Sequence, residues 1–447
     1  MFKKLVFLFL FVSLVSNAQH TIKGELKPAG NFEWLIMYQL QGAKQNYIVD
    51  TKIKDGQFTI VIPEQVKPGV YRLIYNLKNR LFVDIIYNNE DIEFTLNPDF
   101  PSQTIEFISS DENKMYTQYL NETSTAQQKL DSLQIAYFSA KTQVEKKNIE
   151  KKYSTHFSKL KDLQQWFEKE SEQKLVYNFI KAMARFNAEK PIKEPETYLN
   201  DVKNHFFDTI DFSDEILLNS TIINTKINDF IFYLDNSDDK TTLLKLRKKA
   251  IETVLIKIKE NKNLTKNIQE GLLYNFVQQQ NVELTKFILT EHYEKLPSNY
   301  QDLAFIKDIK GQLRTAVGMQ VPNFTWKEKN LYSLKESKYY IVIFWSSTCG
   351  HCLKELPVVY TYLKDRKDVQ VLAIGLEDEK SKIGWIDEVH YYPKWIHILG
   401  KNKWKNKIAR AYGIHATPTY IILDKEKKVL AKPDDFKALE AFFSVKK

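Results

Sequence analysis

The sequence predicts a multidomain chain, in which an N-terminal antiparallel β sandwich, a central all-α region and a C-terminal α/β domain follow one another. Three observations support this order. Short β-rich runs separated by turn residues come first, glycine and proline nearly disappear from the middle, and apolar strands alternate with helical patterns near the C-terminus. A chain of 447 residues is long enough for about three such domains.

The first 18 residues have the pattern of a secretory signal peptide. Lys3 and Lys4 precede an uncharged apolar run over residues 5–15, and small residues up to Ala18 follow it. The run is shorter than the about 20 residues that a membrane-spanning helix needs. We therefore expect cleavage after about Ala18 and export of the mature protein to the periplasm.

Residues 19–110 are predicted to form the β sandwich. Turn sequences such as Asp55-Gly56 and Lys67-Pro68-Gly69 separate the β-rich runs. About seven short strands at this spacing suit two packed antiparallel sheets. The predicted strands are Ile22–Leu26, Trp34–Leu40, Tyr47–Thr51, Phe58–Ile62, Val70–Tyr75, Leu81–Tyr87 and Ile92–Leu96.

Residues 111–317 are predicted to be helical. Glycine is absent from residues 70–270, and Pro191 and Pro195 are the only prolines from residue 102 to residue 296. Leu, Lys, Glu and Gln, which favour helices, are abundant there. Apolar residues also recur at helical spacing, so we expect several helices with a break at the two prolines.

Residues 318–447 are predicted to form the α/β domain. Tyr339–Trp345 is a continuous apolar run, which is typical of a central strand buried on both faces. Helical spacing follows from Cys349 to Leu363. The other predicted elements are a strand at Val369–Leu376, a short helix at Lys405–Tyr412, a hairpin of Tyr420–Leu423 with Val429–Ala431, and a closing helix at Phe436–Phe443.

Composition excludes several classes of function. The formal net charge of +9 comes from scattered lysines mixed with Asp and Glu, without an Arg-rich stripe, so no nucleic acid is expected as a partner. A zinc site needs four ligands. The chain has two cysteines, and the spacing of His351, His397 and His415 fits no usual metal pattern. We expect neither a metal nor another cofactor.

The two cysteines, Cys349 and Cys352, form a CxxC motif. A disulfide that closes so small a loop constrains little of the unfolded chain, so stabilisation explains the pair poorly. The predicted helix begins at or near Cys349, where unpaired N–H groups and the helix dipole stabilise a thiolate. Cys349 is therefore the predicted nucleophile, and the more buried Cys352 is predicted to resolve the mixed disulfide.

Two nearby side chains are candidates for redox tuning and proton transfer. His351 can stabilise the Cys349 thiolate, and stabilising the reduced form makes a dithiol pair more oxidising. The alternative for His351 is a surface side chain without redox effect. Glu355, one turn after Cys352, can carry the proton that Cys352 loses. Its alternative is an exposed carboxylate paired with a lysine.

These residues resemble the thioredoxin superfamily, most closely its TlpA-like branch of exported thiol:disulfide oxidoreductases. The resemblance covers residues 318–447 and rests on Phe344-Trp345-Ser346-Ser347-Thr348-Cys349-Gly350-His351-Cys352, on Glu355 and Pro357, and on Gly413-Ile414-His415-Ala416-Thr417-Pro418-Thr419-Tyr420. It implies a thioredoxin fold with Cys349 and Cys352 as a redox-active disulfide. It also implies a cis Pro418 against the cysteines and client binding by Thr417, Pro418 and Trp345, with the client added as a strand at Thr417.

Two positions depart from the family pattern. Many thioredoxins have a buried acidic residue six positions before the first cysteine, where this chain has Ile343. Proton transfer is therefore expected to depend on Glu355. Thr348 stands directly before Cys349 in place of the usual Trp, which predicts a smaller and more polar cap.

The N-terminal part has a weaker resemblance of its own. Its sequences Asp55-Gly56-Gln57-Phe58 and Asn89-Glu90-Asp91-Ile92 are similar to a β domain that precedes such modules in exported proteins of Bacteroidetes. This resemblance implies no chemistry.

The predicted function is thiol:disulfide exchange on protein clients in the cell envelope. TlpA-like relatives are mostly reductants supplied by a membrane electron donor, which favours a reductase with a membrane-bound electron partner. Oxidising isomerases share the Gly-His pair between the cysteines, so an oxidase or isomerase is an alternative. A client-binding scaffold with a redox-inactive fold is an alternative of another class. A peroxidase is disfavoured, because its reactive cysteine normally stands alone.

Overall fold

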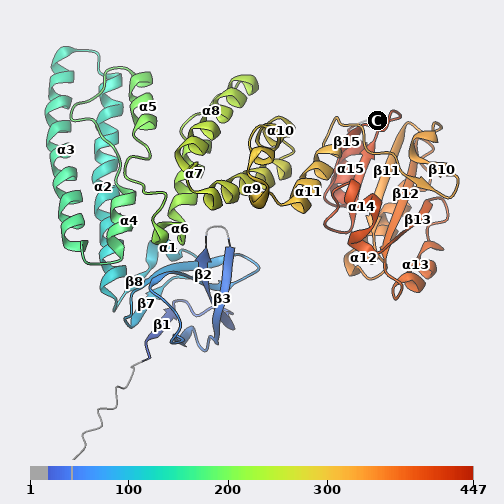
Figure 1. Ribbon diagram of the computed structural model, residues 1–447, viewed down its shortest axis with the longest axis horizontal. Helices are drawn as coiled ribbons and strands as arrows, with labels where there is room; N and C mark the ends of the chain where they lie inside the picture. Colours follow the sequence, from blue (N-terminus) through green and yellow to red (C-terminus); the bar gives the residue numbers. More distant parts are fainter. Residues whose placement is uncertain (1–18, 42–43, 446–447) are drawn as a thin grey trace, which may run out of the picture. The chain divides into compact units, whose positions relative to one another are not determined.

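The computed structural model describes residues 19–41 and 44–445 (Figure 1). The predicted signal peptide lies outside these residues. The chain divides into two compact units, Met1–Leu264 and Thr265–Lys447. The predicted domain limits at 110/111 and 317/318 follow changes in the type of secondary structure, and they stay predictions. Within the described residues, no helix is both long enough and apolar enough to cross a membrane.

The first unit begins with two four-stranded sheets that share one apolar core. Their strand orders are β4-β1-β7-β8 and β3-β2-β5-β6, and every pairing is antiparallel except that of β1 with β7. The predicted antiparallel sandwich is confirmed, with this one parallel contact. The strands are β1 (Thr21–Leu26), β2 (Trp34–Gln41), β3 (Lys44–Lys52), β4 (Gln57–Val61), β5 (Gly69–Asn76), β6 (Leu81–Tyr87), β7 (Ile92–Leu96) and β8 (Glu106–Phe107).

Strand alternation explains why these sequences form a sandwich. In β4, Phe58 and Ile60 are buried while their neighbours along the strand are exposed. In β7, Ile92, Phe94 and Leu96 are buried in the same way. Successive side chains of a strand point to opposite faces, so each sheet turns one apolar face to the core.

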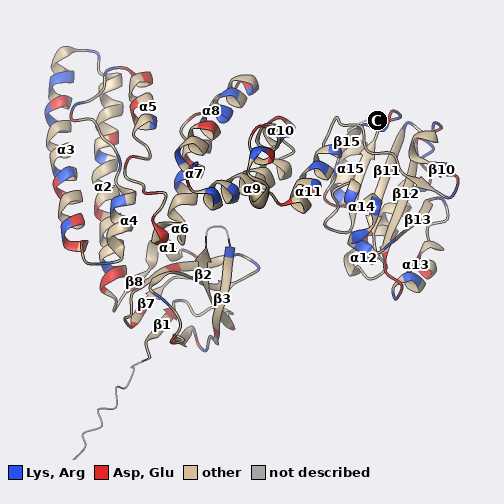
Figure 2. Ribbon diagram, viewed as in Figure 1, with Lys and Arg blue, Asp and Glu red and all other residues tan. Residues whose placement is uncertain are grey.

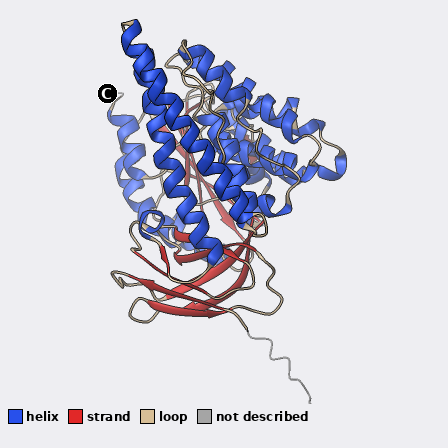
Figure 3. Ribbon diagram, turned by 90° about the vertical axis from the view of Figure 1, so that its left-hand side faces the viewer, coloured by secondary structure: helices blue, strands red, loops and turns tan. Residues whose placement is uncertain are grey.

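Helices fill the rest of the first unit, as predicted. The two longest, α2 and α3, have 29 residues each and lie side by side around Leu130, Tyr153 and Leu160 (Figures 1 and 3). Charges of both signs are spread along them (Figure 2). The helices are α1 (Pro101–Thr104), α2 (Asp111–Ser139), α3 (Gln143–Ser171), α4 (Val176–Met183), α5 (Pro195–Asn204), α6 (Glu215–Leu218), α7 (Ile222–Phe232) and α8 (Lys240–Ile258).

Two buried polar side chains at the start of α2 connect this helix to its neighbours. The Asn113 side chain accepts a hydrogen bond from the N–H of Ile86 in β6 (2.8 Å) and donates one to its carbonyl (2.6 Å). The Glu112 carboxylate accepts from the N–H of Val176 (2.7 Å) at the start of α4, where helices leave N–H groups unpaired. Because buried polar groups need partners, these hydrogen bonds fix the position of the start of α2 against the sheet and against α4.

The second unit contains a five-stranded sheet of order β13-β12-β11-β14-β15. Strands β11, β12 and β13 are parallel, whereas β14 and β15 are antiparallel to their neighbours. The strands are β9 (Thr325–Trp326), β10 (Lys329–Asn330), β11 (Tyr339–Trp345), β12 (Val369–Glu377), β13 (Ile396–Lys401), β14 (Thr419–Leu423) and β15 (Val429–Ala431). The helices are α9 (Lys262–Gln278, which crosses the division), α10 (Val282–Glu291), η1 (Tyr293–Lys295), η2 (Ser298–Tyr300), α11 (Leu303–Arg314), η3 (Leu331–Ser333), α12 (Gly350–Leu363), α13 (Lys382–Val389), η4 (Lys403–Lys405), α14 (Lys407–Ala411) and α15 (Phe436–Ser444).

Apolar clusters cover both faces of this sheet. One contains Leu356 of α12 and Phe443 of α15, and the other contains Ala409 of α14 and Tyr412. All seven residues of β11 are buried, as its unbroken apolar sequence predicts. The predicted C-terminal α/β domain is confirmed, and the sequence analysis missed α13 and β13. Strand β13 interrupts its apolar residues with His397, Gly400 and Lys401, so it lacks the unbroken pattern of a buried strand.

Helix α11 packs against the segment that follows α14 at two glycines. A Cβ atom on Gly311 would lie 2.9 Å from the carbonyl oxygen of Arg410, and one on Gly413 would lie 2.6 Å from the backbone nitrogen of Gln312. The Thr315 hydroxyl donates a hydrogen bond to the carbonyl of Tyr412 (3.1 Å). The two backbones approach closely because neither glycine has a side chain.

Candidate functional site

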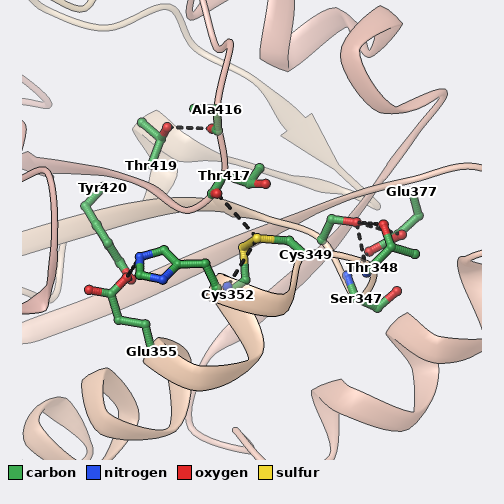
Figure 4. Close-up of a disulfide and its surroundings, with 12 residues drawn as sticks. Ser347, Thr348, Cys349, Cys352, Glu355, Glu377, Ala416, Thr417, Thr419 and Tyr420 are labelled. Carbon is green, nitrogen blue, oxygen red and sulfur yellow. Dashed lines mark hydrogen bonds and ion pairs between the residues drawn. A yellow bond between two sulfur atoms is a disulfide. The ribbon is translucent and has the colours of Figure 1, made fainter. Parts of the chain in front are cut away.

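The first cysteine lies where β11 passes into α12. Cys349 is the N-cap residue of α12, and its Sγ accepts a hydrogen bond from the N–H of Cys352 (3.1 Å). The two cysteines form a disulfide with their Cα atoms 5.2 Å apart (Figure 4). The helix N-terminus therefore directs its positive dipole end at the Cys349 sulfur, together with a backbone N–H group that has no partner within the helix. This arrangement favours negative charge on Cys349 once the disulfide is reduced.

The second cysteine is enclosed by apolar side chains. Cys352 is 0% exposed and packs in the cluster formed by β11, α12 and α15. Cys349 is only partly buried. A disulfide that approaches from solvent can therefore reach Cys349 but not Cys352.

The loop before β14 lies against the cysteine pair. The Thr417–Pro418 peptide bond is cis, and the carbonyl oxygen of Thr417 is 3.3 Å from the Cys349 sulfur. No residue in the described part of the chain accepts a hydrogen bond from the N–H of Thr417. His415 and Ala416, just before it, are exposed. A free backbone edge thus runs beside the reactive sulfur, and an extended peptide can add to such an edge.

Glu355 occupies a protected position beneath the cysteines. Its carboxylate accepts a hydrogen bond from the Tyr420 hydroxyl (3.0 Å; Figure 4). It accepts another from the N–H of Phe436 at the start of α15. Its side chain is 10% exposed, and no lysine pairs with it among the described residues. Burial and the nearby Glu355 carboxylate raise the pKa of Tyr420 well above its usual value, so Tyr420 remains a hydrogen-bond donor. The alternative of an exposed Glu–Lys pair is therefore wrong.

His351 lies on the solvent side of the same carboxylate. Its Nε2 atom is 3.5 Å from Glu355 Oε2, and its side chain is 67% exposed. The imidazole and the carboxylate form an ion pair whenever the imidazole is protonated. His351 thus has Glu355 as its partner, and it lies between the two cysteines in the chain.

The expected client-binding role of Trp345 is wrong. The sequence analysis placed it among the client-binding residues, but its side chain is 0% exposed and packs in the same cluster as Cys352. It is the last residue of β11, and β11 is covered on both faces. A side chain enclosed in this way offers no surface to a client.

A second buried carboxylate, which the sequence analysis missed, holds the loop before Cys349. Glu377 is 1% exposed and ends β12, directly beside the end of β11. It accepts hydrogen bonds from the N–H of Ser347 (2.6 Å) and the hydroxyl of Ser346 (3.2 Å) (Figure 4). The Ser346 hydroxyl in turn lies 3.0 Å from that of Thr348. The signal in the sequence was an acidic residue at the carboxyl end of a buried parallel strand, where ligand and active-site groups often gather.

The other histidines considered for a metal site have separate contacts. His397 Nε2 lies 2.8 Å from the carbonyl oxygen of Tyr392, and burial lowers the pKa of His397. His415 Nε2 lies 2.7 Å from a carboxylate oxygen of Asp308. Within the described ranges, no group of three or more His, Cys, Asp or Glu residues is arranged to hold a metal ion.

Parts of the chain are similar to known proteins. A family model for thioredoxin-like proteins matches residues 337–429. The chain is 26% identical over 98 residues to a thioredoxin-like protein of Haemophilus influenzae, which covers 22% of this chain and 56% of that protein. It is 29% identical over 120 residues to thiol-disulfide oxidoreductase ResA of Bacillus thuringiensis, which covers 26% of this chain and 67% of that protein.

Among solved structures, a domain described as a possible thiol-disulfide isomerase from Cytophaga hutchinsonii is 30% identical. That match covers 29% of this chain and 92% of the other, with a TM-score of 0.25. The aligned part of this chain spans little more than half of the Haemophilus protein's length.

Proposed function

The C-terminal part of this chain is thioredoxin-like, and on that premise we propose that the protein is a thiol:disulfide oxidoreductase of the TlpA-like kind that acts on protein clients in the cell envelope. One observation carries the proposal. Cys349 is the N-cap of α12 and accepts a hydrogen bond from the N–H of Cys352. It also lies beside the Thr417 carbonyl in the loop that contains cis-Pro418, which we call the cis-proline loop. These three features together supply a stabilised thiolate next to a free backbone edge.

The exchange takes place in two steps. The Cys349 thiolate attacks one sulfur of a client disulfide, forms a mixed disulfide and releases the other client sulfur, which takes up a proton. Cys352 then loses its proton and attacks the Cys349 sulfur, which releases the client as a dithiol. The client gains two electrons and the cysteine pair becomes a disulfide. A reductase must therefore be reduced again, and we assign this step to a membrane-bound dithiol donor.

Glu355 is the proposed proton carrier for Cys352. Its carboxylate is nearly buried one turn along α12, and Ile343 leaves the usual acidic position of the family without a carboxylate. His351, 3.5 Å away on the exposed side, gives the proton a path to solvent. General acid–base groups typically contribute about 10²-fold or more to a rate.

Replacing Glu355 with glutamine is expected to slow dithiol turnover about tenfold to a hundredfold and to change its dependence on pH. Glutamine keeps the size and the hydrogen-bond acceptor for the Phe436 N–H, while it cannot exchange a proton near neutral pH. The measurement is the rate of insulin disulfide reduction from about pH 5 to about pH 9. Glu440→Gln, an exposed carboxylate on α15, is the matched control. A pH–rate profile of Glu355→Gln that superimposes on that of the unchanged protein would contradict the role.

The direction of the reaction is proposed to be reduction, with oxidation or isomerisation as the second candidate because of His351. Among proteins with this kind of cysteine pair, reduction potentials run from about −270 mV for thioredoxin to about −180 mV for disulfide isomerase. The test equilibrates the mature protein with glutathione buffers and counts free thiols by alkylation and mass. We expect a potential at or below about −250 mV, as in a reductant.

The other outcomes of this titration are equally informative. A potential near about −180 mV or above would assign the protein to the oxidases and isomerases. The absence of any reversible two-electron couple would refute the enzyme proposal and leave a client-binding scaffold. Repeating the titration with His351→Ala separates the effect of the imidazole from that of the fold.

A further inference from the structure

The free backbone edge at Thr417, where we propose that a client strand binds, is called the client edge. It follows His415 closely in the chain, and His415 lines a cavity in the same compact unit. This cavity has a volume of about 440 Å³ and lies between α11 and the segment from η4 to His415. Its walls include Lys307 and Asp308 of α11, Trp404 of η4, and Arg410 of α14. His415, which also lines it, is two residues before Thr417 in the chain. We refer to it as the α11 cavity.

The walls of the α11 cavity are held in a defined geometry. His415 Nε2 lies 2.7 Å from Asp308 Oδ1 and 3.3 Å from Gln312 Nε2. The close approach of Gly311 and Gly413 brings the backbones of both walls together a few residues away. The cavity is therefore formed before any client arrives, and binding there requires little reorganisation.

The charge of the cavity is complementary to an acidic group. Lys307 and Arg410 are exposed, and neither forms an ion pair with another residue of the described chain. The cavity's one lining carboxylate, Asp308, is already bonded by His415 and Gln312. Trp404 is 48% exposed and adds an aromatic surface to the same wall. Two free cations beside an aromatic ring favour a carboxylate whose stem packs on the ring.

The distance along the chain fits a residue close to the client's reactive cysteine. A peptide that pairs with Thr417 runs beside Ala416 and His415, which are both exposed. An extended strand advances about 3.3 Å per residue, so about two or three residues reach the cavity from the cysteine pair. A client strand that runs past Ala416 to His415 therefore reaches the wall of the cavity that Lys307 and Arg410 also line.

We propose that the α11 cavity is a second client subsite that takes an acidic side chain about two or three residues from the reactive cysteine of the client. This inference rests on the proposed function. It also explains the packing of α11 against the cis-proline loop, because the helix supplies one wall of the subsite. The class of ligand is an extended peptide with Asp or Glu at that position.

The test compares two synthetic peptides with one internal disulfide, identical except for Glu or Lys at the third position from the first cysteine. A second pair places the variable residue on the other side of that cysteine. For the mature full-length protein we expect kcat/KM to be about fivefold or more higher for Glu than for Lys in one of the pairs, and the preference to fall with added salt. Lys307→Glu and Arg410→Glu should each reduce or reverse this preference for the Glu peptide.

Two controls separate this subsite from the redox activity itself. Lys437→Glu, an exposed lysine of α15, makes the same charge change away from the cavity and should keep the preference. Turnover of the small neutral disulfide 2-hydroxyethyl disulfide should be equal in all variants. Equal kcat/KM for Glu and Lys peptides in both pairs, with normal turnover of the small disulfide, would overturn the subsite. Loss of turnover on every disulfide by the unchanged protein would instead refute the proposed function.

Discussion

Replacing Cys349 with serine is expected to abolish disulfide turnover, with a loss of at least about a thousandfold, because a hydroxyl cannot replace the attacking thiolate. The buried Cys352 cannot take over, since it is 0% exposed and a client disulfide cannot reach it. Cys352→Ser should lose turnover equally. Insulin reduction with dithiothreitol as the electron source measures both losses.

The two variants should differ in what they retain. Cys352→Ser still forms the mixed disulfide through Cys349 but cannot resolve it, so client adducts should accumulate. These adducts are detected on non-reducing gels and identified by mass after the purified variant is exposed to an envelope extract. The double variant is the control without thiols. Stable adducts on Cys349→Ser and none on Cys352→Ser would reverse the assigned roles.

Replacing Gly413 with alanine is expected to lower the free energy of unfolding of the second unit by about 3 kcal/mol. Two costs add at this position. The backbone of Gly413 has a φ of +62°, which side chains other than glycine rarely adopt, and the new Cβ would lie 2.6 Å from the backbone nitrogen of Gln312. Chemical denaturation followed by tryptophan fluorescence measures the loss, because five of the seven tryptophans lie in this unit.

Two other glycines separate the conformational cost from the steric one. Gly318 has a φ of +86° but no atom within 4 Å of an added Cβ, so Gly318→Ala should cost only about 1 kcal/mol. Gly311 has no such φ but would meet the carbonyl oxygen of Arg410 at 2.9 Å, so Gly311→Ala should fall between the two. Equal losses for Gly413→Ala and Gly318→Ala would show that α11 does not press against the cis-proline loop.

The local features of the redox site are readable in the sequence. The change from an unbroken apolar strand to helical spacing placed the start of a helix at or near Cys349, and the structure makes Cys349 the N-cap of α12. A cap depends on the residues just before and after it, so neighbours in the sequence are enough to predict it. Seven of the eight strands of the sandwich and the helical middle were predicted on the same basis, because side-chain periodicity is a local property.

The partners of several residues could not be predicted in this way. Trp345 was expected to bind clients but lies in the interior, and Glu377 was overlooked although it holds the loop before Cys349. Both outcomes depend on which strands are neighbours in the sheet, and here β12 pairs with β11 although a whole helix separates them in the chain. The parallel contact of β1 with β7 has the same origin.

The sequence by itself determined the order of the three kinds of structure and the position of the cysteine pair at a strand-to-helix junction. It also identified the residues that lie near the pair on the same helix. Only the tertiary structure decided that Glu355 bonds Tyr420 and Phe436, and that Asp308 of α11 reaches His415 beside the client edge. The physical reason is the range of the interactions. Periodicity and capping act within a few residues, whereas these contacts join residues separated by 65 or more positions, and packing of the whole unit brings them together.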